Sequence, residues 1–246
     1  MEKLIFGNLK MNFNQKETNL YLEKLIALVK DCKNKIVLFV PDVYLMPCSQ
    51  KLAATNIKLG AQNVSYFKNN GPTGEISAKM LKDYCKMVLV GHYDRKKYFS
   101  ETTEQINQKI KNLLECGLKI VLCVGETKSE RVGKRTKTAV EKQVSECLKG
   151  LYENELNNII IAYEPIWAIG SSSAATLTQI QEGTDAIRNA IKTDFSETAS
   201  KKIKILYGGS VDYANAGIIL PCKNINGLLL GKTALSAAEF AKICSL

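Results

Sequence analysis

The sequence predicts a protein of the α/β class, folded as a closed (β/α)8 barrel. The chain has 246 residues, a length that α/β barrels often reach as one domain. Eight short apolar runs alternate with segments of helical spacing, and eight repeats in this length average about 31 residues, the length of a βα unit. No Gly/Ser linker or low-complexity tract interrupts the chain, so we expect a single domain over residues 1–246. Periodicity alone leaves an open, doubly wound sheet as the alternative.

The eight apolar runs are predicted as parallel strands. Each is a continuous segment of β-branched or aliphatic residues, not an alternating one, as expected when both faces of a sheet are covered. In chain order the runs are Leu4–Phe6, Ile36–Val40, Ile57–Ala61, Met87–Val90, Ile120–Val124, Ile159–Tyr163, Ile203–Tyr207 and Gly227–Leu230.

Helices are predicted between these strands. In the range Thr18–Lys30, leucines recur at steps close to the helical repeat and predict an amphipathic helix. Thr178 and Gln181 have the spacing of a capping box, which predicts the start of a helix that runs through Ile191.

Composition favours a folded, soluble chain with a lysine-rich surface. Hydrophobic residues make up 46% and charged residues 24%, which sets disordered and fibrous classes aside. The 34 Lys and Arg exceed the 24 Asp and Glu by 10. Arginine, the preferred reader of bases and phosphates, occurs only at Arg95, Arg131, Arg135 and Arg188. We therefore expect a mild attraction for anions and no dedicated nucleic-acid or membrane partner.

Cysteine usage and the N-terminal residues indicate a cytoplasmic protein. The eight cysteines contain no C-x-x-C pair and many lie in apolar segments, which favours buried free thiols over a zinc ribbon or a disulfide framework. No signal-peptide h-region follows Met1, and no stretch approaches the ~18 apolar residues of a membrane span.

Polar residues gather where the predicted strands end, which is where barrel enzymes carry their chemistry. This set comprises Asn8 and Lys10 after the first strand, His92, Asp94 and Arg95 after the fourth, Glu164 and Pro165 after the sixth, Gly208, Gly209 and Ser210 after the seventh, and Gly231 and Lys232 after the eighth.

His92 and Glu164 are the candidate acid–base residues. His92 is the only histidine, which excludes a two-histidine metal site, and a helix N-terminus at this strand exit would favour its neutral form. Glu164 at the end of an apolar strand would lose hydration and become a stronger base than a surface carboxylate. The structural alternatives are a core histidine and a salt bridge between Glu164 and a lysine.

Two loops are candidates for binding and enclosing a ligand. The range Pro165–Ala175 has the small residues of a closing lid, although an exposed turn has the same composition. The glycines of Gly208–Ser210 and Gly231 permit close backbone approach to a phosphate. Gly227–Thr233 imitates a phosphate-binding P-loop, but it has three residues between its glycines where a P-loop needs four.

Several motifs resemble one family over essentially the whole chain. Gly7–Asn12 is similar to G-N-W-K-M-N, Gly91–Arg95 to G-H-S-E-R, Ala162–Gly170 to A-Y-E-P-[VI]-W-A-I-G, and Tyr207–Val211 to Y-G-G-S-V. Further similarity covers Gly60–Asn63, Thr73–Ser77 and Cys123–Thr127. On these motifs the chain resembles the triosephosphate isomerase family, which implies a TIM barrel.

The resemblance implies a glycolytic isomerase that interconverts dihydroxyacetone phosphate and glyceraldehyde 3-phosphate through an enediolate, with no metal and no cofactor. It implies that Glu164 is the base, neutral His92 the hydrogen-bond donor to the carbonyl oxygen, and Lys10 the electrostatic stabiliser. It further implies that Asn8 positions the substrate and that the phosphate is bound by a set comprising Gly170, Ser210, Gly231 and Lys232. A homodimer is also implied, in which the loop around Thr73 enters the neighbouring subunit near its Asn8 and Lys10.

Departures from the family pattern cluster around the site. Tyr93 replaces a serine that can hold the base, Asp94 replaces a glutamate that pairs with the lysine, and Lys232 replaces a glycine. The lid tip, which includes Ser172, replaces a Thr-Gly-Lys type sequence. These changes leave two alternatives open: a catalytically impaired phosphate-binding or structural relative, and another phosphate-binding barrel enzyme.

Overall fold

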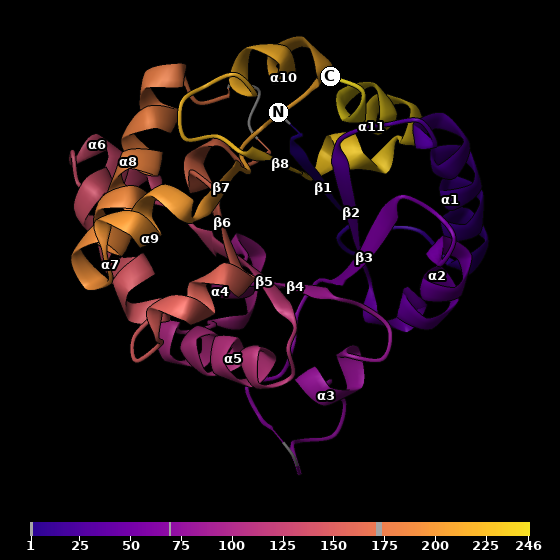
Figure 1. Cartoon of the computed structure of the whole chain (residues 1–246), viewed down its shortest axis with the longest axis horizontal. Coiled ribbons are helices and arrows are strands. Elements are labelled where there is room, and N and C mark those ends of the chain that lie inside the picture. The colour runs from indigo at the N-terminus through magenta and orange to yellow at the C-terminus, as the bar shows by residue number, and fades with distance from the viewer. Residues whose placement is uncertain (1, 69, 171–173) are drawn as a thin grey trace.

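The computed structural model describes residues 2–68, 70–170 and 174–246, and within them eight parallel strands close into a barrel (Figure 1). Each strand pairs with the next in the chain, and β8 pairs with β1, so the sheet has no open edge. The strands are β1 (Leu4–Asn8), β2 (Lys35–Val40), β3 (Ile57–Ala61), β4 (Met87–Val90), β5 (Lys119–Val124), β6 (Ile159–Tyr163), β7 (Lys204–Tyr207) and β8 (Gly227–Leu230). The predicted barrel is confirmed, and the open sheet is excluded.

Helices surround the barrel, as Figure 1 shows looking down it. The α-helices are α1 (Gln15–Val29), α2 (Leu45–Leu52), α3 (Ala78–Leu81), α4 (Tyr93–Phe99), α5 (Thr103–Glu115), α6 (Lys128–Val132), α7 (Thr136–Cys147), α8 (Leu177–Asp194), α9 (Glu197–Lys202), α10 (Tyr213–Ile219) and α11 (Ala237–Cys244). Short 3-10 helices are η1 (Asp42–Tyr44), η2 (Glu153–Asn158), η3 (Ile166–Ala168) and η4 (Lys232–Leu235).

Alternate residues of every strand except β3 contribute to two separate cores. Leu4 and Phe6 of β1 belong to the cluster inside the barrel, where Phe6 and Phe39 meet edge to face. Ile5 belongs instead to the larger cluster between the barrel and the helices. Because both faces of the strands are buried, the sequence shows continuous apolar runs without polar alternation.

Two helix starts differ from those predicted. α8 begins after Thr176, whose side chain accepts a hydrogen bond from the backbone N–H of Gln179, so the predicted box at Thr178 and Gln181 is wrong by two residues. Thr176-x-x-Gln179 has the same pattern and lies first in the chain, so it caps the helix, whereas Gln181 bonds Asp185 one turn later. α1 begins at Gln15, ahead of the predicted Thr18, because Asn14 and Glu17 form a capping box.

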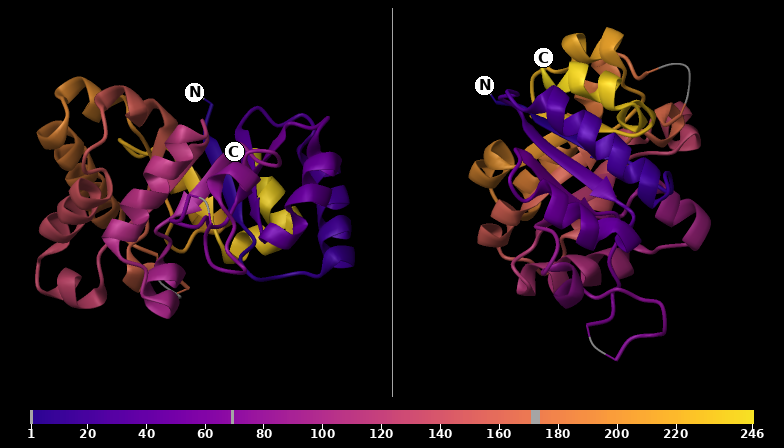
Figure 2. Two further views of the ribbon diagram at one scale, coloured as in Figure 1. Left: turned by 90° about the horizontal axis from the view of Figure 1, so that it is seen from below. Right: turned by 90° about the vertical axis from the view of Figure 1, so that its right-hand side faces the viewer.

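The carboxyl ends of the strands lie at one end of the barrel, where the following loops meet. The loop between β3 and α3 is an exception, because it projects from the body of the molecule (Figure 2) and leaves Thr73 exposed. No helix in the described part of the chain is long and apolar enough to cross a membrane.

Candidate active site

A cavity of about 790 Å³ opens at the carboxyl ends of the strands. Its lining includes every residue that the sequence analysis assigns to catalysis or substrate binding: Asn8, Lys10, His92, Glu164, Gly170, Ser210, Gly231 and Lys232. Residues from five strand ends thus converge on one site, as the barrel geometry requires.

Glu164 presents a buried carboxylate to this cavity. It follows β6 directly, and its backbone N–H donates to the Val124 carbonyl at 2.8 Å. The residue is 4% exposed, and its Oε2 has no hydrogen-bond partner among the described residues. Its Oε1 lies 3.5 Å from Nε2 of His92, and the described residues place no lysine within ion-pair distance of the carboxylate. The predicted burial is confirmed, and the structural salt bridge to a lysine is not formed.

Gly208 has no side chain and so leaves room for this carboxylate. A Cβ added to Gly208, which follows β7, would lie 2.8 Å from Cγ of Glu164. The loop after β7 therefore approaches the carboxylate at a distance that only glycine permits without displacement.

His92 is held in a single orientation at the start of α4. Its Nδ1 accepts a hydrogen bond from the backbone N–H of Asp94 at 3.1 Å, which makes it the N-cap of that helix. Only an imidazole without a proton on Nδ1 accepts this bond, so the neutral ring carries its proton on Nε2. Nε2 is the atom that faces Glu164. The ring can therefore donate a hydrogen bond into the cavity.

Lys10 lines the cavity in a strained but well-anchored backbone conformation, with φ of 50°. Its N–H donates to Oδ1 of Asn8 at 2.9 Å, and its carbonyl accepts from the amide of Gln62 at 3.0 Å. The Lys10 ammonium lies 2.9 Å from Oδ2 of Asp94. Asp94, although shorter than the glutamate it replaces, still reaches this ammonium. The support from Gln62 was not predicted, although its motif was recognised.

These features agree with the comparison of the chain with known proteins. The family described as Triosephosphate isomerase matches residues 3–246. Two relatives named triosephosphate isomerase each align with 98% of this chain and 97% of their own length. The one from Thermoanaerobacter pseudethanolicus is 39% identical to this chain, and the one from Caldanaerobacter subterraneus subsp. tengcongensis is 40% identical. One from Clostridium botulinum is 38% identical over the same shares.

This chain belongs to the triosephosphate isomerase family. It is therefore an isomerase with the TIM-barrel fold of that family, and triosephosphate isomerisation is the function supported by the family match and by the relatives.

The substitution of Tyr93 leaves the cavity of this isomerase unobstructed. Tyr93 is the first residue of α4 and lies outside the cavity lining. Its ring instead lies 5.6 Å from the ammonium of Lys97, within cation–π range. The bulky phenol is thus accommodated beside the helix.

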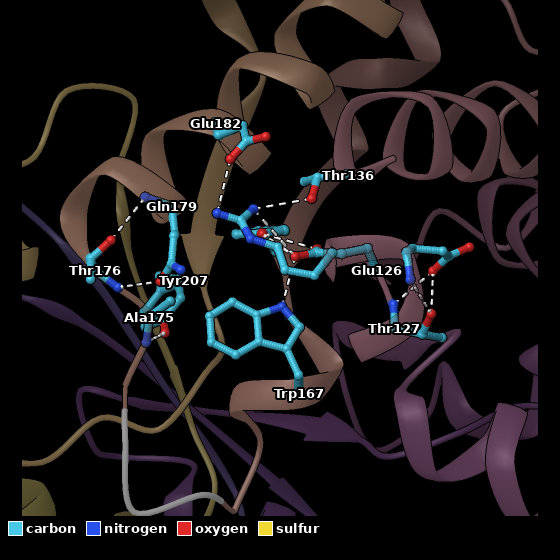
Figure 3. Close-up of polar contacts among 12 residues, drawn as sticks. Glu126, Thr127, Thr136, Trp167, Ala175, Thr176, Gln179, Glu182 and Tyr207 are labelled. Carbon is cyan, nitrogen blue, oxygen red and sulfur yellow. Dashed lines mark hydrogen bonds and ion pairs between the residues drawn. The ribbon is translucent and has the colours of Figure 1, made fainter. Parts of the chain in front are cut away.

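The lid predicted over Pro165–Ala175 is tied to β7 through Ala175 (Figure 3) and to the loop that follows β7. The backbone N–H of Ala175 donates to the Tyr207 hydroxyl at 3.2 Å, and the hydroxyl of Ser210 donates to the Ala168 carbonyl at 2.7 Å. Burial raises the pKa of Tyr207 to about 12, while the bond from Ala175 acts in the opposite direction. Ser172 and its two neighbours lie outside the described residues, whereas Gly170 adopts a left-handed φ of 67°.

A buried glutamate anchors the start of the lid, and the sequence analysis did not predict this role. Glu126 is fully buried, and it accepts hydrogen bonds from the Trp167 indole at 2.8 Å and the Tyr163 hydroxyl at 3.0 Å (Figure 3). Burial and then the Glu126 carboxylate raise the pKa of Tyr163, so its hydroxyl remains a donor. Nη1 of Arg131 lies 3.6 Å from Oε1 of Glu126, and its Nη2 lies 2.9 Å from Oε2 of Glu182. The signal in the sequence was an acidic residue placed two positions after an apolar strand.

The loops after β7 and β8 also line the cavity. A Cβ on Gly209 would lie 2.2 Å from the Tyr207 hydroxyl, so this turn requires glycine. Lys232 is exposed at the start of η4, and no carboxylate of the described residues lies within ion-pair distance of its ammonium. Gly227–Leu230 forms β8, which rules out a P-loop there.

Proposed function

We propose that this chain interconverts dihydroxyacetone phosphate and glyceraldehyde 3-phosphate through an enediolate, using side chains alone. The observation that carries the proposal is the pairing of Glu164 and His92 in the cavity. A buried carboxylate, with one oxygen that has no hydrogen-bond partner in the described part of the chain, faces an imidazole whose accepting nitrogen is already occupied. This arrangement suits removal of a carbon-bound proton beside a polarised carbonyl.

The reaction follows from these roles. Glu164 takes the proton from the carbon next to the carbonyl, and the electron pair left behind forms the enediolate. The Nε2–H of His92 donates to the carbonyl oxygen as it gains negative charge, and the Lys10 ammonium stabilises the same charge. The amide of Asn8 holds the substrate oxygens in place. Glu164, now protonated, returns the proton to the neighbouring carbon. The hydroxyl proton on the first oxygen passes to the former carbonyl oxygen by way of Nε2 of His92, so the new carbonyl forms and the protein is left unchanged.

The phosphate would be bound by the glycine-rich loops and covered by the lid. Backbone N–H groups around Gly170, Ser210 and Gly231 are the proposed ligands, in the way that anions bind to such turns. The exposed ammonium of Lys232 adds a positive charge at this end of the cavity. A closed lid would exclude water from the enediolate, which otherwise loses phosphate.

A homodimer is part of the same proposal. The projecting loop carries Thr73, and we infer that it enters the neighbouring subunit near Asn8 and Lys10. Two apolar side chains are strongly exposed in the single subunit, Met11 beside Lys10 to 95% and Val43 in η1 to 75%. Apolar surface of this kind favours association. A Thr73→Arg variant should shift the purified protein toward monomer in sedimentation velocity at micromolar concentration.

We also infer one domain over residues 1–246 and a cytoplasmic location. The eight strands build one barrel with one shared set of covering helices, which supports a single folding unit. The eight cysteines are free thiols, which is typical of proteins in a reducing compartment.

The decisive experiment is an isomerase assay on the purified protein, from an expression strain that lacks its own isomerase. Conversion of glyceraldehyde 3-phosphate is measured beside a Glu164→Ala variant prepared identically. We expect robust turnover that falls about 10²- to 10⁴-fold, or more, in the variant with an unchanged circular dichroism spectrum. Absence of turnover with retained phosphate binding would identify a catalytically impaired relative instead.

A further inference from the structure

Gln143, a residue outside the cavity, connects the supports of both candidate reactive groups. It lies on α7, and its amide binds the backbone of Gly125 twice. Nε2 donates to the Gly125 carbonyl at 2.9 Å, and Oε1 accepts from the Gly125 N–H at 3.2 Å. Both polar groups of one peptide residue are thus held by one side chain, so Gly125 cannot shift without breaking two bonds.

Gly125 in turn sets the position of the Glu164 main chain. A Cβ on Gly125 would lie 1.9 Å from the Glu164 carbonyl oxygen, so the two backbones are in direct contact. The residue before Gly125, Val124, accepts the hydrogen bond from the Glu164 N–H. Any displacement at the end of β5 would therefore move the start of the Glu164 side chain.

The same amide is tied to the helix that begins at His92. The ammonium of Lys96 donates to Oε1 of Gln143 at 3.2 Å and to the Cys123 carbonyl at 3.3 Å. Lys96 lies one helical turn after His92, and its N–H contacts the His92 carbonyl at 3.4 Å. Gln143 thus joins α4, which carries His92, to the end of β5, which supports Glu164.

This link matters because few polar groups hold the oxygens of the Glu164 carboxylate in place. One oxygen has no partner among the described residues, and the other is 3.5 Å from Nε2 of His92. The separation of the two groups therefore depends on where their backbones are placed. Reacting groups lose rate steeply when they are misplaced by as little as 1 Å.

We propose that Gln143 is a positioning residue, which sets the separation of Glu164 and His92 through Gly125 and Lys96. The inference rests on the proposed function, because it assumes that these two groups perform the chemistry. Gln143 touches neither the cavity nor the substrate, so its effect is expected in kcat, with substrate binding largely preserved.

The test compares variants of Gln143 with a matched control. Gln143→Leu removes all three hydrogen bonds, while Gln143→Glu keeps the two acceptor contacts and loses the bond to the Gly125 carbonyl. The control is Asn107→Leu, because Asn107 also spans two elements with a half-buried amide that donates to the Cys147 and Lys149 carbonyls. It removes bonds of the same kind far from the cavity lining.

We expect Gln143→Leu to lower kcat about 10- to 100-fold with KM changed less than about threefold. The kcat of Gln143→Glu should lie between that of Gln143→Leu and that of the unmodified chain, and Asn107→Leu should retain full kcat. Affinity for inorganic phosphate should remain unchanged in Gln143→Leu, whereas affinity for a planar phosphorylated enediolate analogue should fall in parallel with kcat.

The outcomes separate this proposal from the proposed function. If the unmodified chain turns over and Glu164→Ala does not, but Gln143→Leu keeps its kcat or behaves like Asn107→Leu, the positioning role is overturned and the function stands. If the unmodified chain shows no turnover, the function fails and the positioning role fails with it. Should Gln143→Leu not fold, Gln143→Glu decides: a selective loss of kcat and analogue affinity supports the role, and unchanged values contradict it.

Discussion

At the scale of single residues, the site depends on how closely its groups approach one another. Glu164 is buried and packed against backbone on two sides, at Gly125 and at Gly208. Both contacts require glycine, since a side chain at either position would occupy the space of the Glu164 main chain or its Cγ. Gly125 and Gly208 therefore leave the space that Glu164 occupies.

A Gly208→Ala substitution tests this packing. The new methyl would lie 2.8 Å from Cγ of Glu164 and must displace it. We expect kcat to fall about 10- to 100-fold, because the carboxylate is moved relative to the substrate carbon. Steady-state kinetics on Gly208→Ala, with Gly217→Ala as a control in α10 where an added Cβ meets nothing within 4 Å, provide the measurement. Equal kcat values for both variants would contradict this account.

Asp42 gives a second prediction at this scale, concerning pH and stability. Burial raises its pKa from 3.8 to about 6, opposed by the charge of Arg95. A carboxyl with a raised folded-state pKa contributes stability that is fully present below about pH 4 and is lost as pH rises through about 6. Asp42→Asn removes this loss, so it should raise Tm at pH 8 by about 2–4 °C and leave Tm unchanged at pH 4.

Differential scanning calorimetry at pH 4, 6 and 8 measures this effect. The exposed Asp83, changed to Asn, is the matched control. If Asp42→Asn raised Tm equally at all three pH values, ionisation of Asp42 would not be the cause of the increase.

At the scale of elements, the loop predicted to be a lid is anchored at both ends of its described part by different chemistry. Its first residues are held through the Trp167 indole on the buried Glu126, and its last through the Ala175 N–H on the Tyr207 hydroxyl. Arg131 connects the first anchor to α8 through Glu182. The lid is thus coupled to the covering helices as well as to the strands.

Glu126→Leu should destabilise this anchor strongly. The change leaves Arg131, Tyr163 and Trp167 without their shared acceptor, and removal of one partner of a buried ion pair costs about 3–5 kcal/mol. Glu126→Gln keeps one carbonyl oxygen as acceptor, so it should lower the free energy of unfolding by less. Urea unfolding followed by the fluorescence of Trp167, the only tryptophan, measures both variants. A loss below about 1 kcal/mol for Glu126→Leu would show that the network contributes little.

At the scale of the whole molecule, the net charge of +10 bears on how the substrate arrives. Both proposed substrates are phosphate dianions, and a positive field raises the rate of encounter. The Lys232 ammonium at the cavity and the dispersed surface lysines contribute to this field in different ways, since one acts locally and the others over longer range.

We expect kcat/KM to fall roughly 10-fold as ionic strength rises from about 10 to 200 mM, while kcat changes little. Lys232→Gln should reduce the dependence of kcat/KM on ionic strength more than Lys149→Gln, which removes an exposed lysine outside the cavity lining. Kinetics at five salt concentrations provide the slopes. A flat response of the unmodified chain would exclude electrostatic steering.

Most of the fold was predictable because its signals are local. Each strand is an apolar run whose two faces are both buried, so β3, β4, β6 and β8 match their predicted bounds. The sequence likewise marked His92 and Glu164, because an ionisable residue one or two positions after such a run lies at a strand end. Local signals were less reliable at helix starts, where Thr176 and Thr178 present the same capping pattern two residues apart.

The sequence by itself thus determined the strand and helix order and the residue types at the strand ends, since these depend on neighbours a few positions away. Closure of β8 onto β1 and the 3.5 Å approach of His92 to Glu164 were decided only in the tertiary structure. So were the burial of Glu126 under the lid and the contacts of Gln143 with Gly125. These features join segments that are far apart in the chain, and packing between whole elements is what brings them together.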